Sequence, residues 1–178
     1  MNVLLTGGNG YLGSYIIRGI SPGDVFTIGL ENCNVNIDIS SIIPSIDRSF
    51  ELIIHTAGKA HVIPRNKAEE DAFFAANYRG TLNLLKGLSR APALPRQFVF
   101  ISKVTVYGLE EGELIAENHP LKGTSAYARS KIMAEEAVMQ WGAKNNVPVA
   151  ILRLPLIAGP DAPGNLGSMI RAAVDADE

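Results

Sequence analysis

The chain has 178 residues and a formal net charge of −2, from 16 Lys and Arg against 18 Asp and Glu. This length predicts one domain, and near-neutral charge without a basic cluster argues against nucleic acid or an acidic lipid surface as partner. A single cysteine, Cys33, excludes an internal disulfide framework. Because the sequence has neither a signal peptide nor an apolar run near the ~20 residues of a membrane helix, we expect a cytoplasmic protein.

Short apolar runs alternate with longer amphipathic segments, a pattern typical of a parallel sheet covered by helices. We expect strands at residues 3–6, 25–29, 35–37, 52–56, 98–102 and 149–154. Helices are expected at about 11–20, 69–90 and 126–144, with a Gly/Pro-rich loop at 158–167 and a last helix at 166–176. Right-handed crossovers would wind the strands into a Rossmann-like, doubly wound parallel α/β sheet of order 3-2-1-4-5-6.

The segment from Val3 to Gly13 indicates a buried strand, a glycine turn and the start of a helix. Gly7, Gly10 and Gly13 fit the pattern T-G-x-x-G-x-x-G. Without side chains, glycines let the backbone turn tightly and approach a pyrophosphate, whose charge the helix N-terminus favours. The alternative is a plain strand-to-helix turn, but the place of the pattern in the first strand–helix unit favours dinucleotide binding.

An acidic residue, Glu31, closes the second predicted strand, where a carboxylate can accept hydrogen bonds from both ribose hydroxyls of the adenosine half. Glu31 would repel a 2′-phosphate, and no Arg follows it at 32–34, so NAD is favoured over NADP. A solvated strand end is the alternative for Glu31. Asp38 fits either a hydrogen bond to the adenine amino group or a cap on the following helix.

Tyr127 and Lys131 lie one helical turn apart near the start of the third predicted helix, so their side chains leave the same face. A cation beside a phenol lowers a pKa that is ordinarily about 10. Such a phenol suits general base catalysis on a sugar or alcohol hydroxyl near neutral pH. A surface cation–aromatic pair has the same spacing, but its place after a dinucleotide loop and a fifth buried strand favours catalysis.

Together these motifs resemble the extended short-chain dehydrogenase/reductase family, in its NAD-dependent sugar-nucleotide epimerase/dehydratase branch. The UDP-hexose 4-epimerase-like members are the most similar, and the resemblance covers nearly the whole chain. It is carried by segments 6–13, 55–58, 77–81, 106–108 and 153–160 and by the Tyr127/Lys131 pair.

The resemblance implies a role for each matching residue. Tyr11 and Leu12 would offer backbone N–H groups to the pyrophosphate, and Lys131 would bind the nicotinamide ribose while it tunes Tyr127. The other implied cofactor contacts are Glu31 and Asn32 at the ribose, Asp38 and Ile39 at the adenine, Ala57 and Gly58 after the fourth strand, Asn77 on the nicotinamide side and Pro155 at its ring.

One position departs from the family. Relatives usually carry Ser or Thr three residues before the Val of the V-Y-G motif, where its hydroxyl bonds the reacting oxygen, whereas this chain has Lys103. Ser102 would point to the opposite face of a continuing strand, and Thr105 shares the parity of Lys103, so Thr105 is the expected catalytic stand-in. Lys103 itself would bind a substrate phosphate or face solvent.

The resemblance implies an enzyme acting on a nucleotide-sugar substrate. Tyr127 would take the proton of the 4-hydroxyl while hydride passes to NAD, and return of the hydride to the other face of the 4-keto intermediate would invert C4. Val104 and Thr105 stand where a dehydratase commonly adds an acid and a base, so an epimerase is favoured, with a reductase as a further option. Residues 1–178 would form the NAD-binding domain without most of the C-terminal substrate-binding region of relatives, so a non-catalytic NAD-binding module is the alternative.

Two further expectations concern surfaces and metals. The apolar strand at 149–154 would be a sheet edge, which predicts a homodimer or other self-association unless the loop at 158–167 or the last helix covers it. His55, His61 and His119 do not form a metal cluster, so no metal is expected, and His55 is predicted to be a core histidine.

Overall fold

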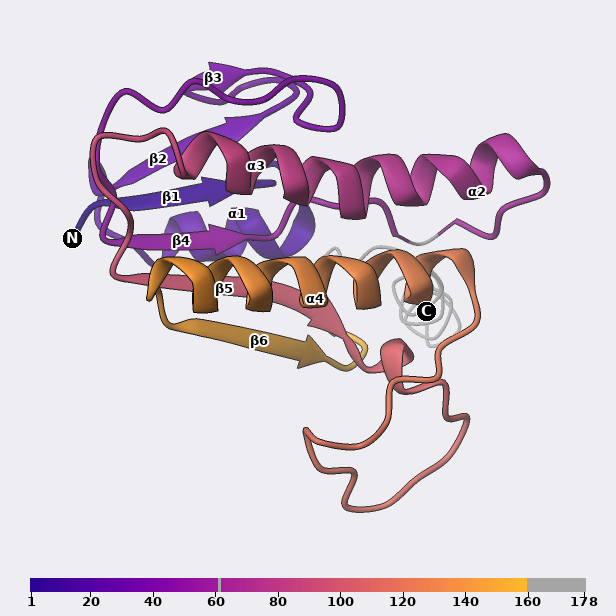
Figure 1. Cartoon of the computed structure of the whole chain (residues 1–178). Helices are drawn as coiled ribbons and strands as arrows, with labels where there is room; N and C mark the ends of the chain where they lie inside the picture. The colour runs from indigo at the N-terminus through magenta and orange to yellow at the C-terminus, as the bar shows by residue number, and fades with distance from the viewer. Residues whose placement is uncertain (61, 160–178) are drawn as a thin grey trace, which may run out of the picture.

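The computed structural model describes residues 1–60 and 62–159 (Figure 1). Its six-stranded, all-parallel sheet has the order β3-β2-β1-β4-β5-β6, which confirms the predicted Rossmann-like fold. The strands are β1 (Val3–Thr6), β2 (Val25–Gly29), β3 (Val35–Asn36), β4 (Leu52–His55), β5 (Gln97–Lys103) and β6 (Val149–Leu154). The helices are α1 (Tyr11–Arg18), α2 (Lys67–Phe73), the π-helical turn η1 (Phe74–Arg79), α3 (Gly80–Leu88), the short 3₁₀-helix η2 (Val104–Tyr107) and α4 (Ala126–Asn145).

Helices α3 and α4 lie side by side on one face of the sheet, and α1 lies on the other (Figure 1). The core between the sheet and α4 is aromatic: the ring centroids of Phe98 and Trp141 are 5.9 Å apart. In β5, Phe98, Phe100 and Ser102 alternate with less buried residues, as period-two geometry requires. The predicted helix at 166–176 and most of the loop before it lie outside the described residues. Within the described part, no helix has the length and apolar character to cross a membrane.

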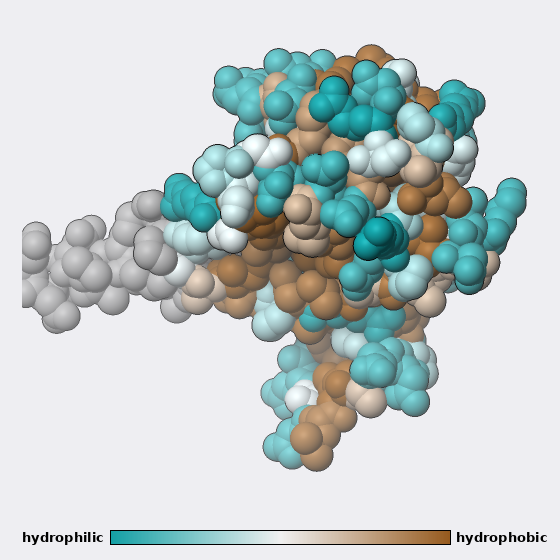
Figure 2. All heavy atoms as spheres, turned by 90° about the vertical axis from the view of Figure 1, so that its left-hand side faces the viewer, coloured by the Kyte–Doolittle hydropathy of each residue, from teal (hydrophilic) through white to brown (hydrophobic). Residues whose placement is uncertain are grey.

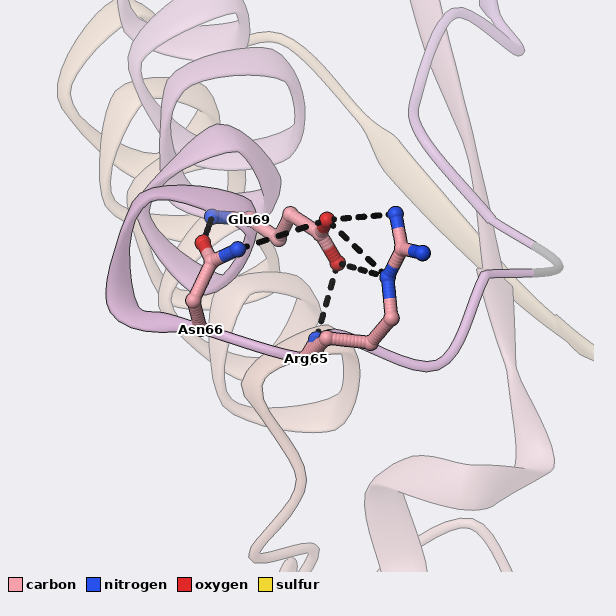
Figure 3. Close-up of polar contacts among 3 residues, drawn as sticks. All are labelled: Arg65, Asn66 and Glu69. Atoms are coloured by element: carbon pink, nitrogen blue, oxygen red, sulfur yellow. Dashed lines mark hydrogen bonds and ion pairs between the residues drawn. The ribbon is translucent and has the colours of Figure 1, made fainter.

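Helix α2 begins at Lys67 because a local polar network caps it. The Asn66 side chain accepts a hydrogen bond from the Glu69 N–H at 2.9 Å, which satisfies a first-turn donor. The Glu69 carboxylate reaches back to the backbone N–H of Arg65 at 2.8 Å and to its guanidinium at 3.0 Å (Figure 3). This arrangement resembles a capping box, and it fixes the residue at which the loop after β4 ends and α2 begins.

The single helix predicted at 69–90 differs in its middle. Helices α2 and α3 are joined without a break by η1, a π-helical turn. Such turns are rare and occur frequently at functional sites. Asn77 lies in η1, is 1% exposed, and uses its side chain to bind backbone and side-chain groups of other elements. The hydrophobic spacing of the sequence did not reveal this turn, because its partners are distant along the chain.

A long loop, residues 108–125, projects away from the sheet between η2 and α4 (Figure 1). Arg153 of β6 fixes its base: the guanidinium pairs with the buried Glu135 carboxylate at 2.8 Å and donates to the Tyr107 hydroxyl at 3.0 Å and the Glu117 carbonyl at 2.6 Å. The end of the loop presents apolar side chains to solvent (Figure 2), from Leu109, Leu114 and Ile115.

Candidate dinucleotide-binding and catalytic site

A pocket of about 500 Å³ lies at the carboxyl ends of β1, β2 and β4. The winding of the sheet reverses between the neighbouring strands β1 and β4, because the chain crosses from β3 to the other side of β1, and doubly wound folds bind ligands at such a switch point. Among the residues predicted to bind cofactor, the pocket is lined by Gly7, Gly10, Glu31, Asp38, Ile39, Ala57 and Gly58. Lining residues that the sequence analysis did not propose include Asn9, Ser40, Thr56 and Lys59.

The glycine turn after β1 is as tight as the motif predicts. Gly7 has φ +75°, and a Cβ there would lie 2.6 Å from the Ala57 nitrogen. A Cβ at Gly13 would lie 2.1 Å from the Gly7 carbonyl oxygen, so only glycine lets α1 approach β1 this closely. Tyr11 and Leu12 form the start of α1, and the N-terminus of a helix favours the binding of an anion.

The acidic side of the pocket is held by short polar contacts. The Asn9 side-chain amide donates to the Glu31 carbonyl oxygen, which joins the glycine turn to the end of β2. Asn32 follows in the left-handed region at φ +50° and turns the chain away. The Asp38 carboxylate accepts from the Ser40 N–H at 2.8 Å. Asp38 therefore caps a turn, since within the described residues no helix directly follows it for the cap considered above, and it also lines the pocket.

Asn77 and Lys131 meet the pocket at Gly58. A Cβ on Gly58 would lie 2.7 Å from Asn77 Oδ1, which is a clash, and 3.4 Å from Lys131 Nζ, which is van der Waals contact. Asn77 Nδ2 also donates to Ser130 Oγ at 2.9 Å, and that hydroxyl donates to the Tyr127 carbonyl at 2.7 Å. The structure therefore brings the first two turns of α4, which carry Tyr127 and Lys131, to the wall of the dinucleotide pocket.

Lys131 is 4% exposed, and its ammonium donates to the Ile101 carbonyl at 2.8 Å and lies 4.6 Å from the Phe100 ring centroid. Burial lowers the pKa of Lys131 to about 8, although Glu135 opposes the shift. Burial raises the pKa of Tyr127 above its ordinary value. The expectation that Lys131 lowers the Tyr127 pKa is wrong for this geometry, because the ammonium is directed at Ile101 and desolvation of the phenol dominates.

Strand β5 ends at Lys103, whose ammonium donates to the Pro155 carbonyl at 3.2 Å. Burial lowers the pKa of Lys103. The 3₁₀-helix η2 starts at the next residue, so the strand alternation that singled out Thr105 ends before it, and Thr105 is exposed. Pro155 follows β6 and is absent from the lining of the described pocket.

Ser102 was not expected to be the catalytic hydroxyl, because strand alternation places its side chain on the opposite face from Lys103. It is 4% exposed, on the same face of β5 as Phe100, the face covered by α4. Its hydroxyl is buried without a hydrogen-bond partner among the described residues. A buried unpaired hydroxyl costs free energy, so it is a notable polar group beside the helix that carries Tyr127 and Lys131.

His55 is fully buried, and both ring nitrogens are hydrogen-bonded, which confirms the predicted core histidine. Burial, assisted by the charge of Lys131, lowers its pKa to about 3, so the ring is neutral at physiological pH. The described residues contain no group of three His, Cys, Asp or Glu side chains arranged to hold a metal ion.

A glycine turn at the switch point of a doubly wound sheet, with an acidic residue after β2, defines a Rossmann-type dinucleotide-binding domain. The chain belongs to the NAD dependent epimerase/dehydratase family, whose family model matches residues 3–176.

Relatives and structural neighbours agree with this assignment. The chain is 26% identical to UDP-glucose 4-epimerase of Azospirillum brasilense over 93% of its length and 51% of that protein. It is 30% identical to UDP-glucose 4-epimerase of Erwinia amylovora over 82% of its length and 50% of that protein. The chain thus spans about half the length of these relatives.

Two solved structures share the fold. A double mutant of dTDP-glucose 4,6-dehydratase from Streptomyces venezuelae, solved with NAD and DAU bound, matches at a TM-score of 0.81 and 23% identity, over 99% of this chain and 63% of that one. MoeE5 in complex with UDP-glucose and NAD matches at a TM-score of 0.79 and 19% identity, over 97% of this chain and 60% of that one.

Proposed function

We propose that the chain is the NAD-binding part of an enzyme that acts on a nucleotide-activated sugar, of the UDP-hexose 4-epimerase type. The observation that carries the proposal is the meeting of Asn77 and Lys131 with Gly58 at the wall of the pocket. This contact puts the helix that bears the Tyr127/Lys131 pair beside the dinucleotide site. The named UDP-glucose 4-epimerase relatives support the type of reaction.

The pocket fits a dinucleotide. Side chains at Gly7 and Gly13 would collide with backbone, so the turn is kept bare where a pyrophosphate must approach α1. Glu31 would accept from the ribose hydroxyls, with Asn32 beside it, and Asp38 and Ile39 would face the adenine. NAD, when bound, supplies the hydride acceptor of the reaction.

The chain's own residues supply the proton chemistry. Tyr127 would take the proton of the sugar hydroxyl, but burial raises its pKa, so the phenol in this geometry holds its proton near neutral pH. Lys131 is the adjacent cation able to offset that burial. Burial leaves the charge of Lys131 poorly solvated and lowers its pKa to about 8, so we expect Lys131 to exchange the Ile101 carbonyl for a stronger partner.

A non-catalytic NAD-binding module is the second candidate, and one observation favours it. Lys103 occupies the position where relatives usually have a Ser or Thr whose hydroxyl bonds the reacting oxygen, and the expected stand-in, Thr105, is exposed in η2. A module of this kind would bind NAD without oxidising a sugar.

The two candidates differ in a direct test. The complete gene product that contains this chain is mixed with NAD and UDP-glucose or UDP-galactose, and epimerisation and nucleotide absorbance are followed. We expect interconversion of the two sugars, lost in Tyr127→Phe with NAD affinity retained, because only the proton-transfer group is removed. NAD binding without any turnover of these or related UDP-hexoses would favour the module.

A further inference from the structure

Four buried polar groups form a continuous hydrogen-bonded chain behind the dinucleotide pocket. Thr6 Oγ1, at the end of β1, lies 2.5 Å from His55 Nδ1, and His55 Nε2 lies 2.8 Å from Thr81 Oγ1 in α3. The Thr81 hydroxyl donates to the Asn77 carbonyl in η1 at 2.6 Å. At the other end, the N–H of the pocket-lining Ala57 donates to Thr6 Oγ1 at 3.4 Å.

The donors and acceptors allow one arrangement of protons along this chain. A carbonyl oxygen only accepts, so the single Thr81 proton is used on Asn77 and Thr81 Oγ1 must accept from His55 Nε2–H. His55 Nδ1 then carries no proton and accepts from the Thr6 hydroxyl. Because the Thr6 hydroxyl proton is donated to His55, Thr6 Oγ1 can otherwise only accept a hydrogen bond, and it accepts one from the Ala57 N–H.

We propose that His55 is a positioning residue for the dinucleotide site: as the Nε2–H tautomer, it holds the Ala57 edge of the pocket in register with the π-helical turn that carries Asn77. The proposal deepens the proposed function and rests on it for the identity of the ligand. Nothing in the family resemblance assigned His55, Thr6 or Thr81 a role toward the cofactor.

The geometry explains why this register matters. The segment after β4 is attached to η1 twice: Lys59 binds the Asn77 side chain, and Ala57 reaches the Asn77 carbonyl through Thr6, His55 and Thr81. Two attachments of neighbouring residues to one turn define the orientation of the segment as well as its position. Burial and the charge of Lys131 keep the His55 ring neutral, so the ring places no second positive charge near the Lys131 ammonium.

Substitutions at Thr81 separate positioning from simple packing. Thr81→Val keeps the shape but leaves His55 Nε2–H without an acceptor, whereas Thr81→Ser keeps the hydroxyl. Ser89→Ala is the matched control, because it removes a hydroxyl of α3's end that binds Trp141 and Leu85 away from the pocket. All four proteins, wild type included, are compared by calorimetric titration with NAD and by NMR of the His55 ring and of the Ala57 and Lys59 amides.

We expect the Nε2–H tautomer in the wild type. Thr81→Val should weaken NAD binding about fivefold or more, the effect of about one hydrogen bond, and shift the Ala57 amide resonance. Thr81→Ser and Ser89→Ala should stay within about twofold of the wild type. An Nδ1–H tautomer, or Thr81→Val with unchanged NAD affinity and an unshifted Ala57 amide, would overturn the proposal. A wild type that fails to bind NAD would refute the proposed function, and the tautomer and the amide shift would still decide whether His55 sets the pocket edge.

Discussion

The side chain of Asn77 binds the backbone of Lys59 at both of its polar groups. Oδ1 accepts from the Lys59 N–H at 2.7 Å, and Nδ2 donates to the Lys59 carbonyl at 3.1 Å. Since Nδ2 also binds Ser130 of α4, one buried amide joins the pocket-lining segment after β4 to the helix that carries Tyr127 and Lys131. The π-helical turn thereby aligns the two halves of the site.

This relationship predicts a large cost for Asn77→Ala. The change leaves the Lys59 N–H and carbonyl and the Ser130 hydroxyl without their partner, and we expect a loss of about 3 kcal/mol of unfolding free energy, measured by urea denaturation. Asn145→Ala is the control, because it removes a single amide hydrogen bond, to the Trp141 carbonyl near the end of α4. Equal losses in the two variants would contradict the anchoring role.

Stability should fall in mild acid because of His55. Its pKa is about 3 in the folded protein and 6.5 when unperturbed. As pH falls below 6.5 the unfolded chain binds the proton first, so the stability contributed by the neutral ring is complete above this pH and is lost toward pH 3. The loss between pH 7 and pH 5 is about 2 kcal/mol. Chemical denaturation at both pH values measures it, and a His55→Gln variant with the same pH dependence would show that other groups cause the loss.

The hydroxyl that serves the reacting oxygen can be assigned by mutation. Ser102 has a buried unpaired hydroxyl on the α4 face of β5, whereas Thr105 is exposed in η2. If the complete gene product has the proposed epimerase activity, we expect Ser102→Ala to lower its turnover by about tenfold or more, since general acid–base hydrogen bonds contribute at least that much. Thr105→Val should have a smaller effect. The reverse order would restore Thr105 as the catalytic hydroxyl.

Strand β6 should promote self-association. It is the outer strand of the sheet, and in the described ranges no strand pairs with its second edge. Ile151 packs against the core, while Leu152 is 44% exposed, so Leu152→Lys is the informative change. We expect this variant to shift the chain toward monomer in light scattering at micromolar concentration. Ile42→Lys is the control, because Ile42 is a similarly exposed apolar residue in the connection between β3 and β4, outside β6, and a monomeric wild type would refute the expectation.

The strand order could be predicted because each buried strand is recognisable in the sequence as a short apolar run. Runs such as Val3–Thr6 are almost entirely apolar and are buried throughout, and the handedness of parallel crossovers then favours one winding. Much of the pocket followed from the same reasoning, since the glycine turn and Glu31 both follow strand ends that converge on one edge of the sheet.

The errors came from contacts between distant parts of the chain. The π-helical turn depends on Asn77 meeting Lys59 and Ser130, and no local pattern encodes those partners. The pKa of Tyr127 follows from burial by neighbouring elements, which spacing along one helix does not reveal. The alternation of side chains along a strand favoured Thr105 only if β5 extended to that residue, but β5 ends at Lys103.

The central claim is that the pocket between Gly7 and Glu31 binds NAD. Calorimetric titration of the 178-residue chain with NAD and with NADP tests it directly, using Glu31→Ala and, as control, the exposed Asp47→Ala. We expect one NAD per chain and weaker NADP binding, because Glu31 would accept hydrogen bonds from the ribose hydroxyls and would repel a 2′-phosphate. Glu31→Ala should remove roughly 1–3 kcal/mol of the discrimination, and Asp47→Ala none. Absence of NAD binding, or NADP binding as tight as that of NAD, would contradict the assignment.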